Sequence, residues 1–140
     1  MGLNNLTIII ADDDDDDKAL MLEALRENGI EKHSIVLASD GEELLTVLPE
    51  YARKPCIVFL DLNMPRKDGR KALMEIRSSE LLKHIPVIIF TTSNSAEDVL
   101  TSYKLGSNTY FSKPFQYKEL VHLMQVIKGY WFENATVALS

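Results

Sequence analysis

The sequence has a single cysteine among its 140 residues and no long hydrophobic run. One cysteine, Cys56, excludes an intrachain disulfide framework and a cysteine-ligated zinc site, and it fits a reducing compartment. No apolar run approaches the roughly 18 residues that a membrane span requires. The N-terminus has no basic stretch before its short apolar run, so no secretory signal is expected. We therefore expect a cytoplasmic protein without a membrane partner.

Basic charge is also scarce, since 15 Lys and Arg residues stand against 21 Asp and Glu residues. Six of the acids form the unbroken run 12–17, and without that run 15 acids balance the 15 bases. Nucleic-acid binding depends on a broad basic surface, which this composition does not provide. We expect no nucleic-acid partner and instead expect one place in the fold where carboxylates converge.

Short β-branched apolar runs alternate along the chain with longer stretches of helical spacing. The predicted strands are 6–11, 34–38, 56–60, 87–90 and 109–112, and the predicted helices lie near 15–28, 41–53, 69–82, 96–105 and 116–132. Five strands alternating with five helices predict a single α/β domain, a doubly wound parallel sheet with helices on both faces. We expect this domain to span 1–133, with a flexible C-terminal tail at 134–140 and no output domain.

Polar side chains follow four of the predicted strands. Asp12 and Asp13 follow the first strand, Asp61 the third, Thr91 the fourth and Lys113 the fifth. Because the carboxyl ends of parallel strands meet at one edge of a sheet, we expect these groups to lie together. The sequence therefore predicts one site that combines carboxylates, a hydroxyl and an ammonium.

This combination of groups suits phosphoryl chemistry. Clustered carboxylates without histidine or cysteine favour a hard cation with oxygen ligands, Mg²⁺ or also Mn²⁺. A cation and a lysine neutralise phosphoryl oxygens, and a hydroxyl donates a hydrogen bond to another. Asp61 is then the candidate nucleophile, and its product would be an aspartyl phosphate.

The same residues, taken in order, carry a family resemblance. The chain has the pattern D-x-x-M-P-x-x-D-G from Asp61 to Gly69, with thirty residues from Asp61 to Thr91 and twenty-two more to Lys113. With Asp12 and Asp13, this set resembles the receiver domain of bacterial two-component response regulators over about residues 6–132. The resemblance implies a flavodoxin-like (βα)5 fold with strand order 2-1-3-4-5.

The resemblance also implies a role for each acidic residue of the site. Asp61 would accept a phosphoryl group from a sensor histidine kinase in a Mg²⁺-dependent reaction. Asp13 and Asp61 would bind the cation directly, Asn63 through its backbone carbonyl, and Asp12 through water. The protein would then be a signalling domain rather than an enzyme, with only self-catalysed phosphotransfer and self-dephosphorylation.

Two further roles implied by the resemblance concern signal output. Lys113 would pair with the acids and then with the phosphoryl group, and its bond to Pro114 is expected to be cis. Thr91 and Tyr110 would form a switch pair, in which Thr91 moves toward the phosphoryl group and Tyr110 turns inward. This movement would reshape the surface of the fourth helix and fifth strand that signals to a protein partner or phosphorelay.

One subgroup of the family is closer than the others. The run Thr91-Thr92-Ser93 and the long last helix with aromatic residues at 130–132 resemble single-domain regulators paired with bacterial phytochromes and other sensor kinases. A phytochrome-type kinase is therefore a candidate partner. The aromatic residues exceed what packing on the sheet needs, which makes a homodimer or another partner contact a hypothesis for this helix end.

Three alternatives fit the sequence less well. A phosphatase that uses an aspartate nucleophile usually needs a second acid two residues later, where this chain has Asn63. A calcium loop of the EF-hand type starting at Asp12 would need glycine in the place of Asp17. A binding module that is never phosphorylated has no feature in its favour. We expect Asp14–Asp17 to serve mainly as a helix start and acidic surface.

Overall fold

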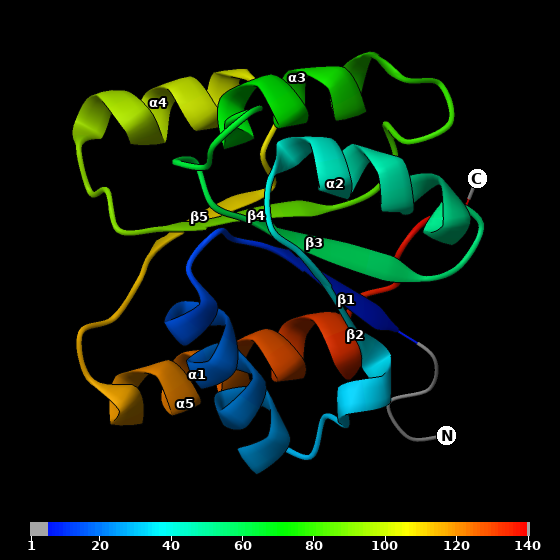
Figure 1. The fold of residues 1–140 in the computed structure, drawn as a ribbon. Coiled ribbons are helices and arrows are strands. Elements are labelled where there is room, and N and C mark those ends of the chain that lie inside the picture. Colours follow the sequence, from blue (N-terminus) through cyan, green and yellow to red (C-terminus); the bar gives the residue numbers. More distant parts are fainter. Residues whose placement is uncertain (1–5, 140) are drawn as a thin grey trace.

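The computed structural model describes residues 6–139. Its centre is one parallel sheet with the order β2-β1-β3-β4-β5 (Figure 1). The strands are β1 (Thr7–Ala11), β2 (Ile35–Ala38), β3 (Cys56–Leu60), β4 (Val87–Thr91) and β5 (Thr109–Ser112). Each predicted strand is present within one residue of its expected ends. The predicted α/β class and the strand order 2-1-3-4-5 are both confirmed.

The three central strands are buried on both faces, as their continuous apolar sequences predict. Every residue of β3 and β4 is buried, and so are the last four residues of β1. Successive side chains of a strand point to opposite faces. Ile9 and Ala11 therefore join the core on one side of the sheet, whereas Ile8 and Ile10 join the core on the other.

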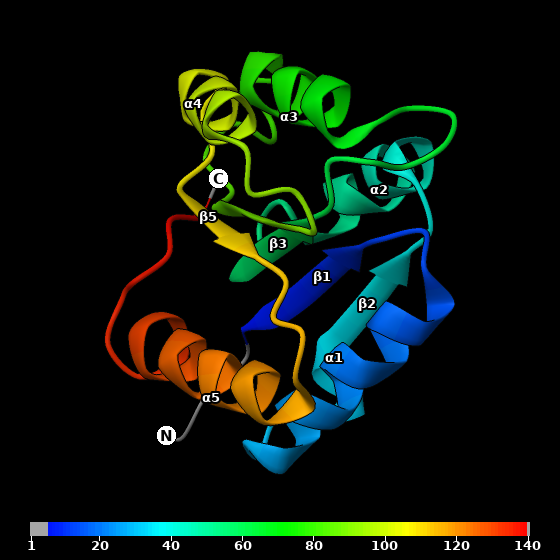
Figure 2. The same ribbon diagram turned by 90° about the vertical axis from the view of Figure 1, so that its left-hand side faces the viewer.

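Two helical layers cover the sheet (Figures 1 and 2). Helices α1 and α5 lie side by side on one face, and α2, α3 and α4 cover the other. Their bounds are α1 (Asp15–Glu27), α2 (Gly41–Val47), α3 (Gly69–Ser78), α4 (Ala96–Lys104) and α5 (Tyr117–Ile127), with short helical segments η1 (Lys32–Ser34), η2 (Leu48–Tyr51) and η3 (Lys128–Phe132). The chain is thus doubly wound, and its strand ends converge at one edge.

Three of the predicted helices end earlier than their apolar spacing indicated. α2 stops at Val47 and continues as the 3-10 segment η2, because Pro49 has no backbone N–H to donate within an α-helix. α3 stops at Ser78, since Ser79 adopts an extended conformation and its hydroxyl accepts a hydrogen bond from the Leu82 backbone N–H at 3.2 Å. The last helix changes type at Lys128.

The change in the last helix alters which aromatic residue is buried. The helical spacing of the apolar residues from Tyr117 to Ile127 predicts that Trp131 continues the stripe that packs on the sheet. The segment η3 has π-helical geometry, which adds residues per turn and shifts the following side chains around the axis. Phe132 is buried, at 7% exposure, and Trp131 is partly buried and packs against the same core, whereas Tyr130 is 59% exposed.

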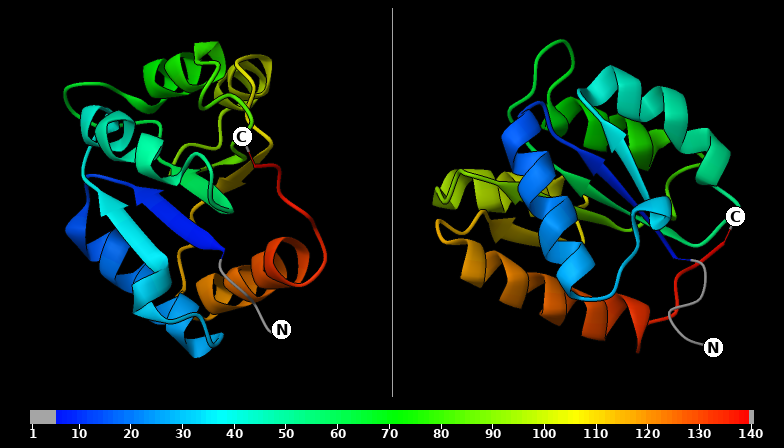
Figure 3. Two further views of the ribbon diagram at one scale, coloured as in Figure 1. Left: turned by 90° about the vertical axis from the view of Figure 1, so that its right-hand side faces the viewer. Right: turned by 60° about the horizontal axis from the view of Figure 1, so that its bottom comes forward.

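Residues 134–139 contain no helix or strand. They run back past the edge of the sheet from which β1 starts (Figure 3). There Thr136 and Val137 line an open hollow with Leu6, Pro55 and Trp131. Residues 1–5 and 140, parts of the expected domain and tail, lie outside the described residues, and the flexibility of the tail stays a prediction. Across residues 6–139, no helix has both the length and the apolar character to cross a membrane.

Two aspartates cap helices on the face formed by α2, α3 and α4, and they make a matched pair for a stability test. Asp40 Oδ1 accepts from the Glu43 backbone N–H at 2.8 Å, and Asp68 Oδ1 accepts from the Lys71 backbone N–H at 3.1 Å. Asp40 also accepts from Arg66 Nε at 2.9 Å. Both carboxylates therefore satisfy a backbone donor at a helix start, but Asp40 makes an ion pair as well.

We expect Asp68→Ala to lower the free energy of unfolding by about 1 kcal/mol, the usual contribution of a helix cap. Asp40→Ala should cost more, because Asp40 is buried and the change also leaves Arg66 without its carboxylate. Urea unfolding followed by circular dichroism measures both. Equal losses in the two variants would contradict the role given to the Arg66 contact.

The pH dependence of the same pair supplies a second check. The hydrogen bond from the Glu43 backbone N–H holds the pKa of Asp40 below its ordinary value, although burial opposes this shift. The hydrogen bond and positive charge of Arg66 lower the pKa as well. A carboxyl with a lowered folded pKa stabilises above its unfolded pKa, and this contribution disappears as the pH falls through the folded pKa. The extra cost of Asp40→Ala should therefore shrink below about pH 4.

Candidate functional site

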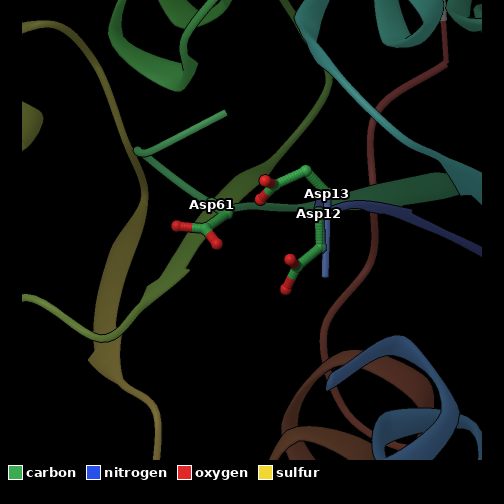
Figure 4. Close-up of side chains that lie close together, drawn as sticks. All are labelled: Asp12, Asp13 and Asp61. Atoms are coloured by element: carbon green, nitrogen blue, oxygen red, sulfur yellow. The ribbon is translucent and has the colours of Figure 1, made fainter. Parts of the chain in front are cut away.

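Three carboxylates converge at the carboxyl ends of β1 and β3. Asp12, Asp13 and Asp61 each offer an oxygen, and these three oxygens lie within 4.8 Å of one another (Figure 4). Asp12 and Asp61 are buried, whereas Asp13 is exposed. Clustered carboxylate oxygens with one side open to solvent are a typical arrangement for a hard divalent cation. The acids predicted from the strand ends thus form one cluster.

Backbone contacts hold Asp61 at the centre of this site. Its N–H donates to the Ala11 carbonyl at 3.0 Å, which continues the pairing of β1 with β3 beyond the strand ends. The loop after β3 then folds back, and the Gly69 N–H donates to the Leu62 carbonyl at 2.9 Å. A Cβ atom on Gly69 would lie 2.1 Å from the Asp61 carbonyl oxygen, so only glycine fits here. The glycine of the D-G pair in the motif is therefore required for steric reasons.

Lys113 reaches the carboxylates from the edge strand β5. Its Nζ donates to Asp12 Oδ2 at 2.7 Å, to Asp17 Oδ2 at 2.7 Å and to Asp61 Oδ2 at 3.1 Å. The side chain is 9% exposed. Burial lowers the pKa of Lys113, but the hydrogen bonds to Asp12 and Asp17 outweigh it, so that the pKa lies above its ordinary value. The ammonium remains charged in the site.

Asp12 has a different electrostatic balance. Burial raises its pKa, and the hydrogen bonds from Lys113 and from the Asp14 backbone N–H counteract part of the rise. Each Asp12 oxygen accepts one hydrogen bond, Oδ1 from the Asp14 backbone N–H at 2.9 Å and Oδ2 from Lys113. Its carboxylate is therefore held in one orientation before any cation binds.

Thr91 connects the acid cluster to the end of β4. It is fully buried, and its hydroxyl donates to Asp61 Oδ1 at 2.7 Å. The Asn63 backbone N–H donates to the same oxygen at 3.2 Å. The Thr91 carbonyl accepts from the Lys113 backbone N–H at 2.7 Å. One residue thus contacts the candidate nucleophile through its side chain and the lysine segment through its backbone.

Tyr110 contacts the loop that follows Thr91. Its hydroxyl donates to the Ser93 carbonyl at 2.9 Å, and its half-buried ring packs against the core beneath α2 and α3. The Ser93 hydroxyl in turn donates to Asp98 Oδ2 at 2.6 Å, and Arg70 donates to Asp98 Oδ1 at 2.8 Å. The hydrogen bonds from Ser93 and Arg70 hold the pKa of Asp98 below its ordinary value. The loop is therefore linked to α3, α4 and β5.

One implied detail is wrong and one contact was missed. Every described peptide bond is trans, including the one between Lys113 and Pro114, and Lys113 reaches the carboxylates from this geometry. Asp17 was expected to belong to the helix start and acidic surface, yet its carboxylate contacts Lys113. The only sign of this contact in the sequence is the position of Asp17. It is the last residue of the acidic run and lies in the first turn of a helix beside the site.

The fold and the site agree with comparisons to known proteins. Residues 8–125 match the sequence model of the response regulator receiver domain. The chain therefore belongs to the response regulator receiver domain family, the signalling domain of two-component systems. The match spans all five strands and the acids, hydroxyl and lysine described above.

The similar proteins include response regulators of one subgroup. The response regulator Rcp1 of Synechocystis sp. (strain PCC 6803) is 36% identical over 135 residues, covering 93% of this chain and 91% of Rcp1. The crystal structure of its Mn²⁺-bound form has a TM-score of 0.80 at 34% identity and covers 96% of this chain and 99% of that one. The phosphorylated cyanobacterial phytochrome response regulator RcpA has a TM-score of 0.81 at 36% identity, covering 94% and 96%.

These relatives agree with two of the expectations. The resemblance to regulators paired with phytochromes is confirmed by the similarity to RcpA. The Mn²⁺-bound form of Rcp1 and the acid cluster of this chain both fit a divalent cation. In this chain Asp12, Asp13 and Asp61 are the residues that would hold it.

We expect Asp13→Ala to weaken Mn²⁺ binding by at least about tenfold, because it removes the exposed carboxylate of the cluster. Asp16→Ala is the matched control, since Asp16 is an exposed acid outside the cluster. Isothermal titration calorimetry with Mn²⁺ measures both variants. Equal affinities for the two variants would place the cation elsewhere.

Proposed function

We propose that this protein accepts a phosphoryl group on Asp61 from a sensor histidine kinase in a Mg²⁺-dependent reaction. The observation that supports this most is the convergence on Asp61 of a buried ammonium, a buried hydroxyl and two further carboxylates. No other described carboxylate of the chain combines these three contacts. Self-catalysed phosphotransfer and self-dephosphorylation complete the proposed activity.

In the proposed step, a carboxylate oxygen of Asp61 attacks the phosphorus of a phosphohistidine. The new O–P bond forms as the P–N bond breaks, and the histidine nitrogen keeps the electron pair. Asp61 is 7% exposed and fixed by its backbone contacts, so its carboxylate is already oriented for the attack. A bound Mg²⁺ would supply positive charge to the phosphoryl oxygens.

Lys113 and Thr91 stabilise the product. Before phosphorylation, the longest hydrogen bond of the Lys113 ammonium is the one to Asp61, at 3.1 Å. After phosphorylation, the same N–H would donate to a phosphoryl oxygen. The Thr91 hydroxyl likewise exchanges Asp61 Oδ1 for a phosphoryl oxygen. Both donor side chains are buried, and hydrogen bonds are stronger in a low-dielectric environment than in water. Asp13, Asp61 and the Asn63 backbone carbonyl would hold the cation, with Asp12 acting through water.

Thr91 and Tyr110 form the proposed switch. The Thr91 hydroxyl and the Tyr110 hydroxyl already make the inward contacts, to Asp61 and to the Ser93 carbonyl. Phosphorylation would favour this arrangement over one with Tyr110 turned outward, as a population shift. The surface that changes is formed by α4 and β5. Leu100 and Tyr103 are exposed on α4, which suits contact with a downstream protein or a phosphorelay partner.

The partners follow from the same proposal. The name of RcpA makes a phytochrome-type kinase the first candidate for the phosphoryl donor. We also propose that a second copy of the protein, or another protein, contacts the end of α5. Val126 and Tyr130 are exposed there. We further propose that the protein is cytoplasmic, because such a kinase would present its phosphohistidine there.

Asp61→Asn should abolish phosphorylation, because an amide oxygen is too weak a nucleophile and the product cannot form. The wild type is expected to gain one phosphoryl group after incubation with acetyl phosphate and Mg²⁺, and to gain none with EDTA. Intact-protein mass spectrometry measures both. Mg²⁺-dependent labelling that persists in Asp61→Asn would move the acceptor to another residue.

Thr91→Ala should separate phosphorylation from the switch. We expect the variant to retain phosphorylation within about tenfold of the wild-type rate, because it keeps Asp61 and Lys113. Fluorotyrosine NMR, with the Tyr110 signal assigned through Tyr110→Phe, should then show no phosphorylation-dependent shift. Thr91→Ser keeps the hydroxyl and should behave as wild type. A full Tyr110 response in Thr91→Ala would exclude the hydroxyl as the link.

A further inference from the structure

The ammonium of Lys113 has three N–H donors, and three different carboxylates each receive one of them. Two of these carboxylates, Asp12 and Asp61, belong to the acid cluster that would hold the cation. The third, Asp17, lies outside that cluster and comes from the first turn of α1. The three partners of Lys113 are therefore not equivalent.

This difference matters when the site is loaded. A cation draws the charge of Asp12 and Asp61 toward itself, and phosphorylation converts the Asp61 carboxylate into an acyl phosphate. Both changes weaken the hydrogen bonds that Lys113 makes to these two residues. Asp17 is the one partner of Lys113 that lies outside the acid cluster, so its hydrogen bond to Lys113 can persist throughout.

The surroundings of Asp17 keep its carboxylate in place. Its backbone N–H donates to the Asp14 side chain at 3.0 Å, which fixes the start of α1. Its side chain is 33% exposed and lines a small hollow with Leu20, Phe90 and Pro114. The carboxylate thus contacts Lys113 from the capped first turn of α1.

We infer that Asp17 is a positioning residue, which holds the Lys113 ammonium toward Asp61 while the phosphoryl group is transferred. The inference rests on the proposed function, since it assigns Asp17 a part in the reaction of Asp61. Without Asp17, the long flexible side chain of Lys113 has no fixed partner once Asp12 and Asp61 are engaged. The ammonium then samples positions from which it does not reach a phosphoryl oxygen.

Three single variants separate geometry from charge. The rate of phosphoryl incorporation from acetyl phosphate and Mg²⁺, followed by intact mass, is expected to fall about tenfold in Asp17→Ala. Asp17→Asn retains an oxygen that accepts from Lys113 and should stay within about threefold of wild type. Asp16→Ala removes a neighbouring exposed acid and should leave the rate unchanged. An Asp17→Ala rate equal to that of Asp16→Ala would overturn the inference.

A double-mutant cycle tests whether Asp17 acts through the lysine. In a Lys113→Ala background, which we expect to retain slow phosphorylation, Asp17→Ala should cause no further loss. A tenfold loss in this background as well would assign Asp17 a merely structural or electrostatic role and would overturn the inference. Wild type is measured in the same series. If wild type gains no phosphoryl group, the proposed function fails, and this result differs from one in which only the role of Asp17 fails.

A second measurement does not depend on phosphorylation. The Lys113 ammonium, with all three N–H groups hydrogen-bonded, should give a ¹H–¹⁵N signal in lysine-labelled wild-type protein. Its proton exchange should be about tenfold faster in Asp17→Ala, since one of the three acceptors is lost. Asp16→Ala should match the wild type. Unchanged exchange in Asp17→Ala would contradict the positioning role even if the protein accepts no phosphoryl group.

Discussion

Lys113 extends from the edge strand β5 across the carboxyl ends of the sheet and joins Asp61 of β3, Asp12 of β1 and Asp17 of α1. Without this ammonium, carboxylates with little access to water would repel one another at short range. Removing one member of such a buried charge network is costly, because it leaves the other charges uncompensated. Because β3 and β4 lie between β1 and β5, Lys113 reaches across the carboxyl ends of the sheet to contact Asp12.

The same network connects chemistry with the protein surface. Thr91 donates to Asp61 through its side chain, and its carbonyl accepts from the Lys113 backbone. Two residues further on, the Ser93 carbonyl accepts from Tyr110. Under the proposed function, a change of charge on Asp61 would act through these hydrogen bonds on the surface of α4 and β5. Local charge coupled to an element with two arrangements is the physical basis of such a switch.

Much of the fold and of the site could be predicted from the sequence. The buried strands have continuous apolar sequences, and the acids, Thr91 and Lys113 stand directly after strands whose ends must meet at one edge. Less could be predicted where local spacing was assumed to continue. Helical periodicity predicts the packing of Trp131, which is partly buried, but not the burial of Phe132, which the π-helical segment turns inward.

The contact of Asp17 was beyond sequence reasoning for a different reason. The aspartates 14–17 look alike in the sequence, and only the rotation of α1 relative to the end of β5 decides which of them faces the lysine. That rotation is set by the packing of Met21, Ala24 and Leu25 against the sheet and α5. A tertiary contact between segments almost one hundred residues apart leaves no periodic signal in the chain.

A crystal structure of the protein with Mg²⁺ and beryllofluoride, a mimic of the phosphoryl group, tests the central claim most directly. The account predicts beryllofluoride on Asp61, with the Lys113 ammonium donating to a fluorine and the Thr91 hydroxyl donating to another. Lys113 should keep its hydrogen bond to Asp17. Beryllofluoride on another residue, or a Lys113 side chain turned into solvent, would contradict the account.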